Sequence, residues 1–236
     1  MPVFLTMVLS TLIMPVMALE SLVKLDHAPL RLENRDKVLS GAKHFKAQCL
    51  VCHSMKYMRF DELSQEAGII PAAMPVWDEL SWGGRPPPDL SLVVKRRSVD
   101  WVYTFLRSYY IDQSSATGFN NLVWQQTKMP NPFAGIQGRQ VLMTSLSTLK
   151  SEHGQRRWSE VLELDKQGIM SGEDFDDYVD DIVNYLAYAS DPSSLEREKI
   201  APWVLGYLCV LFLTLMALSI VYWDEVKRKY YREFKS

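Results

Sequence analysis

The sequence predicts a mostly α-helical protein that carries one C-terminal transmembrane helix. Two observations lead to this fold class. Apolar residues recur at spacings of three and four along the body of the chain, and Pro- and Gly-rich connections separate these stretches without a convincing series of alternating strands. Near the C-terminus, residues 201–223 form a run of 23 residues without a charge. As a helix this run would extend roughly 34 Å, which is enough to cross a bilayer.

The first apolar run, residues 1–18, is typical of a signal peptide, and its last three residues form a plausible cleavage pattern. Because no Lys or Arg precedes the apolar region, an uncleaved N-terminal anchor remains an alternative. The predicted organisation of the chain is therefore a signal peptide or anchor at residues 1–18, an exported domain at 19–199, a transmembrane helix at 200–223 and a tail at 224–236.

The charges of the chain predict its orientation in the membrane. The tail holds five basic and three acidic residues, and the positive-inside rule places such a tail in the cytoplasm and the domain before the helix in the periplasm. Subtracting the tail from the totals of 26 and 28 leaves 21 bases and 25 acids, a net charge of -4, in residues 1–223. This balance gives no indication of nucleic-acid binding. It suits a basic protein partner, although it is also ordinary for a soluble domain.

Helices and irregular segments alternate within the predicted domain. Residues 36–54 are expected to form a helix whose later turns carry Cys49, Cys52 and His53. Residues 69–91 are expected to be irregular because prolines interrupt them. Residues 99–110 repeat apolar side chains at helical spacing, and a long Gly- and Pro-containing loop follows them. The clearest helix begins after Ser171, which can cap it together with Asp174.

This last helix of the domain has two different faces. An apolar face is expected from Phe175, Val179, Ile182 and Leu186, which lie at helical spacing. The opposite face carries acidic residues at positions 173, 176, 177, 180 and 181. This acidic row favours a solvated helix face, and a docking surface for a basic carrier is the alternative.

The main chemical motif lies in FKAQCLVCHSM, residues 45–55, where Cys49, Cys52 and His53 form C-x-x-C-H. This motif predicts covalent attachment of haem c: each thiol adds across a haem vinyl group, and the imidazole becomes an iron ligand. A zinc site, a thioredoxin-like motif and a disulfide are the alternatives. A zinc site needs about four ligands, but the remaining cysteine, Cys209, lies in the apolar run; a thioredoxin-like motif needs a βαβ pattern, but the flanking sequence is helical.

An electron-carrying haem needs a sixth iron ligand, and methionine is a common choice because its thioether favours ferrous iron. Met129 and Met74 both precede proline in predicted loops. Met129 lies 76 residues beyond His53, which leaves room for the chain to pass around the haem, whereas Met74 lies only 21 residues away. The spacing favours Met129, and packing in the core is the alternative for either side chain.

Several segments together resemble the cytochrome c1 family, the haem-c subunits of the cytochrome bc1 complex. In chain order they are AQCLVCHSMKYMRF, GGRPPPDLSLVVKRR, WVYTFLRSYY, GFNNLVWQQTKMPNPF and GIMSGEDFDDYVDDIVNYLAYASDPS, followed by one C-terminal transmembrane helix. The resemblance covers about residues 26–235 and is closest in form to bacterial members with a short loop after the haem motif.

This resemblance implies a cytochrome-c-like haem domain in the periplasm, anchored in the bacterial inner membrane. It implies that Met129 is the sixth iron ligand, and that Arg97, or Arg96 beside it, pairs with a haem propionate; an exposed basic pair is the alternative. Pro87 and Pro88 would line the haem crevice. The sequence departs from the family at Trp101, where tyrosine is common, so the resemblance does not imply a hydrogen bond to the haem from that position.

The resemblance also implies the function. The chain would be a redox subunit of a quinol–cytochrome c reductase, passing electrons from the Rieske iron-sulfur protein through its haem to a c-type cytochrome. Cytochrome b and membrane lipid would be its other partners. Quinol oxidation takes place on cytochrome b in this family, so no acid-base site is expected in this chain. A membrane-anchored cytochrome that serves a terminal oxidase is the alternative, and a haem peroxidase would need an open sixth position.

Overall fold

The computed structural model describes residues 21–78, 86–151 and 155–233, so the predicted signal peptide or anchor at residues 1–18 lies outside the described residues. The chain divides into two compact units, the first ending at Ser190 and the second beginning at Asp191. The helices and strands of the first unit are α1 (Arg35–Gln48), η1 (Lys56–Met58), α2 (Glu62–Glu66), η2 (Pro71–Ala73), α4 (Val93–Arg97), α5 (Val99–Arg107), β1 (Tyr109–Ile111), β2 (Phe119–Asn121), β3 (Gly138–Leu142), α6 (Leu146–Ser151), η3 (Trp158–Glu160), β4 (Leu162–Gln167) and α7 (Gly172–Ser190); the second unit holds α8 (Ser194–Glu233).

Helix α1 is shorter than the predicted helix at 36–54. It begins at its cap Asn34, whose side chain accepts a hydrogen bond from the backbone N of Lys37 at 3.1 Å. It ends at Gln48, after which the backbone N of Leu50 bonds to the carbonyl oxygen of Phe45 at 3.1 Å, five residues back. This wider bond breaks the regular four-residue ladder. The prediction that the later helical turns carry the haem motif was therefore wrong, because the motif lies in the turn that follows.

Helix α5 also ends earlier than predicted. Sequence periodicity placed a helix over 99–110, but α5 stops at Arg107, and Tyr109 and Tyr110 belong to strand β1. These tyrosines pair with Asn121 and Asn120 of β2. Aromatic side chains favour strands when a partner is available, so strand pairing outweighs the helical period here.

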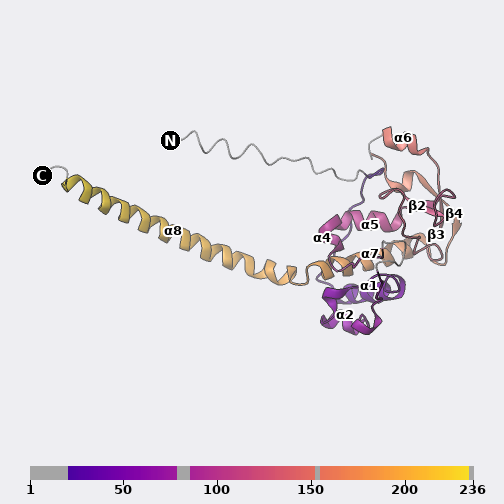
Figure 1. The fold of residues 1–236 in the computed structure, drawn as a ribbon, viewed down its shortest axis with the longest axis horizontal. Coiled ribbons are helices and arrows are strands. Elements are labelled where there is room, and N and C mark those ends of the chain that lie inside the picture. Colours follow the sequence, from indigo (N-terminus) through magenta and orange to yellow (C-terminus); the bar gives the residue numbers. More distant parts are fainter. Residues whose placement is uncertain (1–20, 79–85, 152–154, 234–236) are drawn as a thin grey trace. The chain divides into compact units, whose positions relative to one another are not determined.

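The strands form two small antiparallel sheets, β1 with β2 and β3 with β4. Each strand has only three to six residues. Alternation over so few positions gives little signal, which explains why the sequence did not reveal them. The mainly helical fold class is confirmed, with these two sheets as an addition (Figure 1).

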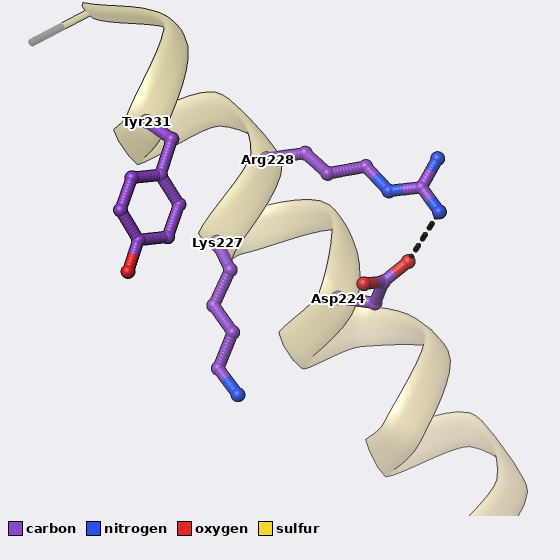
Figure 2. Close-up of a pocket in the computed structure, with 4 residues that line it drawn as sticks. All are labelled: Asp224, Lys227, Arg228 and Tyr231. Atoms are coloured by element: carbon purple, nitrogen blue, oxygen red, sulfur yellow. Dashed lines mark ion pairs between the residues drawn. The ribbon is translucent and has the colours of Figure 1, made fainter.

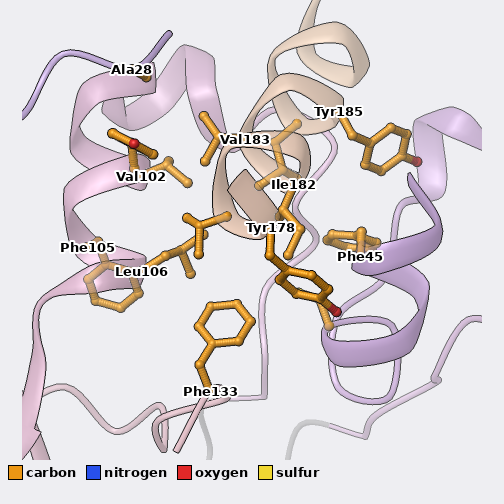
Figure 3. Packing of buried hydrophobic residues seen from close by; sticks show 14 of the residues in the cluster. Ala28, Phe45, Val102, Phe105, Leu106, Phe133, Tyr178, Ile182, Val183 and Tyr185 are labelled. Carbon is orange, nitrogen blue, oxygen red and sulfur yellow. The ribbon is translucent and has the colours of Figure 1, made fainter. Parts of the chain in front are cut away.

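The core of the first unit lies where α1, α5 and α7 meet. Figure 3 shows Phe45 from α1 and Leu106 from α5 pointing toward Ile182 of α7. Helices α1 and α7 approach closely at Gly41, where a Cβ atom would overlap the backbone carbonyl of Asp181. Only glycine permits this crossing, so the position of α1 is set by backbone contact as well as by side-chain packing.

Helix α7 confirms the predicted cap and apolar face. The hydroxyl of Ser171 accepts a hydrogen bond from the backbone N of Asp174 at 3.1 Å and donates to its carboxylate at 2.7 Å. The predicted apolar face is buried, as Phe175 and Ile182 illustrate at 3% and 0% exposure. Burial of this face against α1 and α5 makes α7 the central helix of the unit.

The acidic row of α7 is a solvated face only in part: Glu173 and Asp177 are exposed, but the other three carboxylates pair with basic residues of the unit. Lys37 of α1 places its Nζ 2.7 Å from Asp180 Oδ2 and 2.9 Å from Asp181 Oδ1. Arg107 of α5 lies 3.1 Å from Asp176. Three of the five acidic side chains therefore join helices inside the unit. For Asp181, burial alone would raise the carboxyl pKa, but hydrogen bonds from neighbouring side chains outweigh burial and lower the pKa to about 2.

Helix α8 spans 40 residues and includes the predicted transmembrane segment. Residues 194–231 are long and apolar enough to cross a bilayer, with a mean hydropathy of 2.5 in the most apolar window. The predicted tail continues the same helix up to Glu233. There the Arg228 guanidinium pairs with Asp224 at 2.8 Å, beside an open hollow that Lys227 and Tyr231 also line (Figure 2).

Candidate functional site

The C-x-x-C-H motif forms a tight turn directly after α1. The backbone N of His53 bonds to the carbonyl oxygen of Cys49 at 2.8 Å, and the backbone N of Cys52 bonds to the same oxygen at 3.0 Å. The carbonyl of Cys52 accepts a hydrogen bond from Nε1 of Trp77 at 2.8 Å. Cys49 and His53 are each 7% exposed, and Cys52 is half-buried. One turn thus brings the two predicted thioether sulfurs and the predicted iron ligand together.

The ring of His53 is oriented by a backbone carbonyl. Its Nδ1 lies 2.8 Å from the carbonyl oxygen of Pro88. A carbonyl oxygen can only accept, so Nδ1 carries the hydrogen and Nε2 keeps a free lone pair, as an iron ligand requires. Burial lowers the pKa of His53, against the opposing effects of the Pro88 carbonyl and the Asp89 carboxylate. The imidazole is therefore neutral at neutral pH and able to bind a metal.

The Cys49 thiol lies in an apolar environment. Burial, with a smaller contribution from Cys52, raises the pKa of Cys49 to about 12, which favours the protonated thiol. A protonated, shielded thiol is a poor ligand for a bare metal ion and a poor partner for thiol exchange. Among the residues that the structure describes, no three His, Cys, Asp or Glu side chains are grouped to hold a metal ion.

The PPDLS segment, residues 87–91, lies against the turn through Asp89. Its carboxylate accepts hydrogen bonds from Ser54 Oγ at 2.8 Å and from the backbone N of Lys56 at 2.7 Å. It also accepts one from the backbone N of Ser91 at 3.0 Å. Burial alone would raise the pKa of Asp89, but these hydrogen bonds lower it overall, so the carboxylate is ionised at neutral pH.

Sequence reasoning missed Asp89, although a signal was present. An aspartate two residues before a serine, directly after prolines, is typical of an Asx turn in which the side chain bonds to its own backbone. What the sequence could not indicate is the second half of the contact, the bonds to Ser54 and Lys56, because these residues lie more than 30 positions earlier in the chain.

Met129 lies in the loop between β2 and β3. Its side chain is half-buried and packs against the core, and its backbone N bonds to Oγ1 of Thr127 at 3.3 Å. Met74, at the end of η2, is also half-buried and packs against the core. Burial does not separate the two methionines, so the assignment of the sixth iron ligand remains a prediction.

The two arginines after the PPDLS segment contact different partners. The Arg97 guanidinium lies over the rings of Trp101 and Trp124, at 5.1 and 4.7 Å from their centroids. Arg96 donates from Nη2 to the carbonyl oxygen of Asp89 at 2.8 Å. Both side chains are exposed. Pro87 is half-buried, and Pro88 supplies the carbonyl that holds His53.

The residues present fit a covalently bound haem. The turn offers two thiols and one imidazole with its Nε2 lone pair available, the donor set that haem c uses. The buried donors without a hydrogen-bond partner in the described part of the chain include the Tyr110 hydroxyl and Gln125 Nε2. Such donors are costly unless a further acceptor binds, and haem carboxylates are acceptors.

Comparison with known proteins places these features in a family. The Cytochrome C1 family model matches residues 77–226, which begin after His53 and include the PPDLS segment and most of α8. Cytochrome c1 of Allochromatium vinosum is 36% identical over 221 residues, covering 86% of this chain and 89% of the relative. A protein named ammonia monooxygenase gamma subunit, from Nitrosomonas europaea, is 32% identical over 222 residues with the same coverages.

The haem motif and the family match are two separate observations, because the matched residues do not include the motif. They agree on the cofactor, since proteins of this family bind haem c covalently and the chain presents the thiols and imidazole that attachment needs. The family gives the role, electron transfer as a redox subunit of the bc1 complex. The chain belongs to the cytochrome C1 family.

Proposed function

We propose that the chain accepts one electron from the Rieske iron-sulfur protein and delivers it to a c-type cytochrome. The observation that carries this proposal is the histidine of a C-x-x-C-H turn whose Nδ1 is held by a backbone carbonyl, in a chain of the cytochrome C1 family. When bound, the haem supplies a one-electron ferric–ferrous couple. The residues of this chain retain it, orient it and shield it from water.

Three residues of the turn would hold the haem. Cys49 and Cys52 would form thioethers with the two vinyl groups, and His53 would ligate iron through Nε2. Support comes from the burial of Cys49 and His53 and from the bond that fixes the imidazole tautomer. A buried proximal ring excludes water from this side of the iron, which favours outer-sphere electron transfer over reaction with solvent molecules.

Met129 would be the sixth ligand. Its loop position before Pro130 allows the sulfur to approach iron without the constraint of a helix, and Thr127 anchors its backbone. A thioether opposite histidine raises the reduction potential because it stabilises ferrous iron. This matches an electron acceptor for the Rieske centre, whose two-histidine ligation also gives a high potential.

Arg97 would pair with a haem propionate, with Arg96 as the alternative. The contacts described above favour Arg97. Its guanidinium lies over the faces of two tryptophan rings, whereas the Arg96 guanidinium already donates a hydrogen bond to the Asp89 carbonyl. Stacking on Trp101 and Trp124 restricts the guanidinium while leaving its in-plane N–H groups available to a carboxylate. Pro87 and Pro88 would line the crevice.

Helix α8 would anchor the haem domain on the periplasmic side of the bacterial inner membrane, beside cytochrome b. Its length and apolarity suit a single span, and the basic residues near its end suit a cytoplasmic C-terminus facing anionic lipid. The oxidase alternative is not favoured by the family match.

Purification of the native membrane complex tests the proposal. We expect co-purification of cytochrome b and the Rieske protein, a low-spin haem c spectrum with a thioether-to-iron band in the oxidised state, and reduction of the haem by quinol only when the Rieske protein is present. A complex that contains oxidase subunits instead, or a high-spin haem, would contradict the proposed role.

A further inference from the structure

The turn with His53 and the PPDLS segment form one hydrogen-bonded unit. Five hydrogen bonds join residues 53–57 to residues 88–91, and each connects a different pair of groups. Two of the five end on the carboxylate of Asp89. A third is the bond between His53 Nδ1 and the Pro88 carbonyl, directly before Asp89 in the chain. The aspartate is therefore the centre of the contact.

The geometry of the peptide group connects Asp89 to the imidazole. The Pro88 carbonyl and the backbone N of Asp89 belong to one planar peptide unit, so they move together. Pro88 has no N–H of its own with which to fix its position. The Pro88 carbonyl is therefore held mainly through Asp89. The Asp89 side chain bonds to Ser54 and Lys56, and the backbone carbonyl of Asp89 accepts a hydrogen bond from Arg96.

We propose that Asp89 is the positioning residue for the iron ligand: by accepting hydrogen bonds from Ser54 Oγ and the backbone N of Lys56, it holds the Pro88 carbonyl against Nδ1 and so fixes the plane and the donor strength of the imidazole. This inference rests on the proposed role of His53 as an iron ligand. A hydrogen bond at Nδ1 makes the ring a stronger donor through Nε2, which stabilises ferric iron. Loosening that bond raises the reduction potential.

Substitution of Asp89 in the full-length haem-loaded chain, within its membrane complex, tests the inference. Asp89→Glu keeps the charge but displaces the carboxylate, and Asp89→Asn keeps the shape but removes the charge and at least one acceptor. The matched control is Asp61→Asn, because Asp61 also accepts hydrogen bonds, from Ser64 N and Tyr188, but not in the contact with Pro88. Asparagine is an equally good helix cap, so the control fold is preserved.

Two readouts separate positioning from charge. The electron paramagnetic resonance spectrum of ferric low-spin haem depends on the orientation and donor strength of the axial imidazole, and redox titration gives the midpoint potential. We expect both Asp89 variants to displace the low-spin signal and raise the midpoint, and Asp61→Asn to change neither. The rise corresponds to as much as a roughly tenfold shift in the ferric–ferrous equilibrium, about 59 mV for one electron.

Other outcomes would overturn the inference. A midpoint that rises only in Asp89→Asn, with wild-type resonance spectra in both variants, would show that Asp89 acts as a charge and positions nothing. Unchanged spectra and midpoints in both variants would remove any role. If the Asp89 variants fail to assemble, Ser54→Ala, which removes a single bond, is measured in their place with the same expected direction. If the wild-type protein itself gives a spectrum without histidine ligation, the proposed function is refuted instead.

Discussion

The two loops that carry the predicted iron ligands are held in different ways. His53 is buried, and residues 53–57 are joined to the PPDLS segment by five hydrogen bonds. Met129 is half-buried, and its backbone N makes one hydrogen bond, of 3.3 Å, to Thr127. A residue whose neighbours are held by several hydrogen bonds is displaced only at a high free-energy cost, whereas a residue held by one hydrogen bond is displaced more readily. We therefore expect changes on the histidine side to affect assembly and changes on the methionine side to affect ligation.

The largest effect is expected from loss of the motif itself. Replacement of His53 by Ala, or of either cysteine by Ala, removes iron ligation or covalent retention, so no functional holoprotein should form. Staining for covalent haem after denaturation, together with turnover of the complex, measures this. Cys209→Ala in α8 is the matched control and should retain full staining. Normal staining and turnover in Cys49→Ala would show that the motif does not attach haem.

Met129→Leu should leave the haem attached and the domain folded but stop electron flow. The thioether favours ferrous iron, so its removal stabilises ferric iron and lowers the midpoint, on the order of hundreds of millivolts within the range that axial ligands control. The Rieske centre would then no longer be able to reduce the haem. Redox titration beside Met74→Leu provides the comparison. A lowered midpoint in Met74→Leu together with an unchanged one in Met129→Leu would transfer the ligand role to Met74.

A smaller effect is expected where α1 is attached to α7. The pKa of Asp181 is lowered to about 2 in the folded protein, from an ordinary value of 3.8. Its contribution to stability is therefore complete above pH 4 and is lost as the pH falls toward 2. Asp181→Asn should lower the unfolding free energy by roughly 1 kcal/mol at neutral pH and flatten the dependence between pH 4 and 2. Denaturant unfolding at several pH values measures this; an unchanged slope would contradict it.

The smallest effect is expected from Thr127→Val, which keeps the shape of the side chain and removes the acceptor for Met129 N. One hydrogen bond contributes about 1 kcal/mol. The thioether-to-iron band should disappear at a lower denaturant concentration than in the wild type. The reduction midpoint potential, measured in buffer, should stay close to the wild-type value. Ser114→Ala, in the exposed turn after β1, is a control that should shift neither quantity. If histidine ligation and methionine ligation were lost at the same denaturant concentration, the expected difference between the two sides of the haem would be contradicted.

Local patterns in the sequence predicted the parts of this molecule that depend on nearby residues. Cys49, Cys52 and His53 form their turn within five positions, and the cap of α7 needs only Ser171 and Asp174. The apolar run of α8 is likewise visible in one window. In each case a single stretch of chain contains all the partners that determine the structure.

Long-range contacts could not be predicted in the same way. The end of α5 depends on pairing of Tyr109 with Asn121. Whether Asp180 of the acidic row faces solvent or forms an ion pair depends on Lys37, more than 140 residues earlier. A helical period describes which side chains share a face but not what lies opposite that face. The same limit hid Asp89, whose sequence context indicates a turn but whose partners lie in another loop.

The close crossing of α1 and α7 at Gly41 affects the position of the turn that follows α1. Cys49 lies eight positions beyond this glycine, a distance of about 12 Å along the helix axis. A side chain at position 41 would push α1 away from α7. Because α1 is a continuous helix, its C-terminal end at Gln48 would move as well. There it would pull the imidazole from the carbonyl that holds it. The absence of a side chain at Gly41 therefore helps to set the position of the turn that contains His53, the predicted iron ligand.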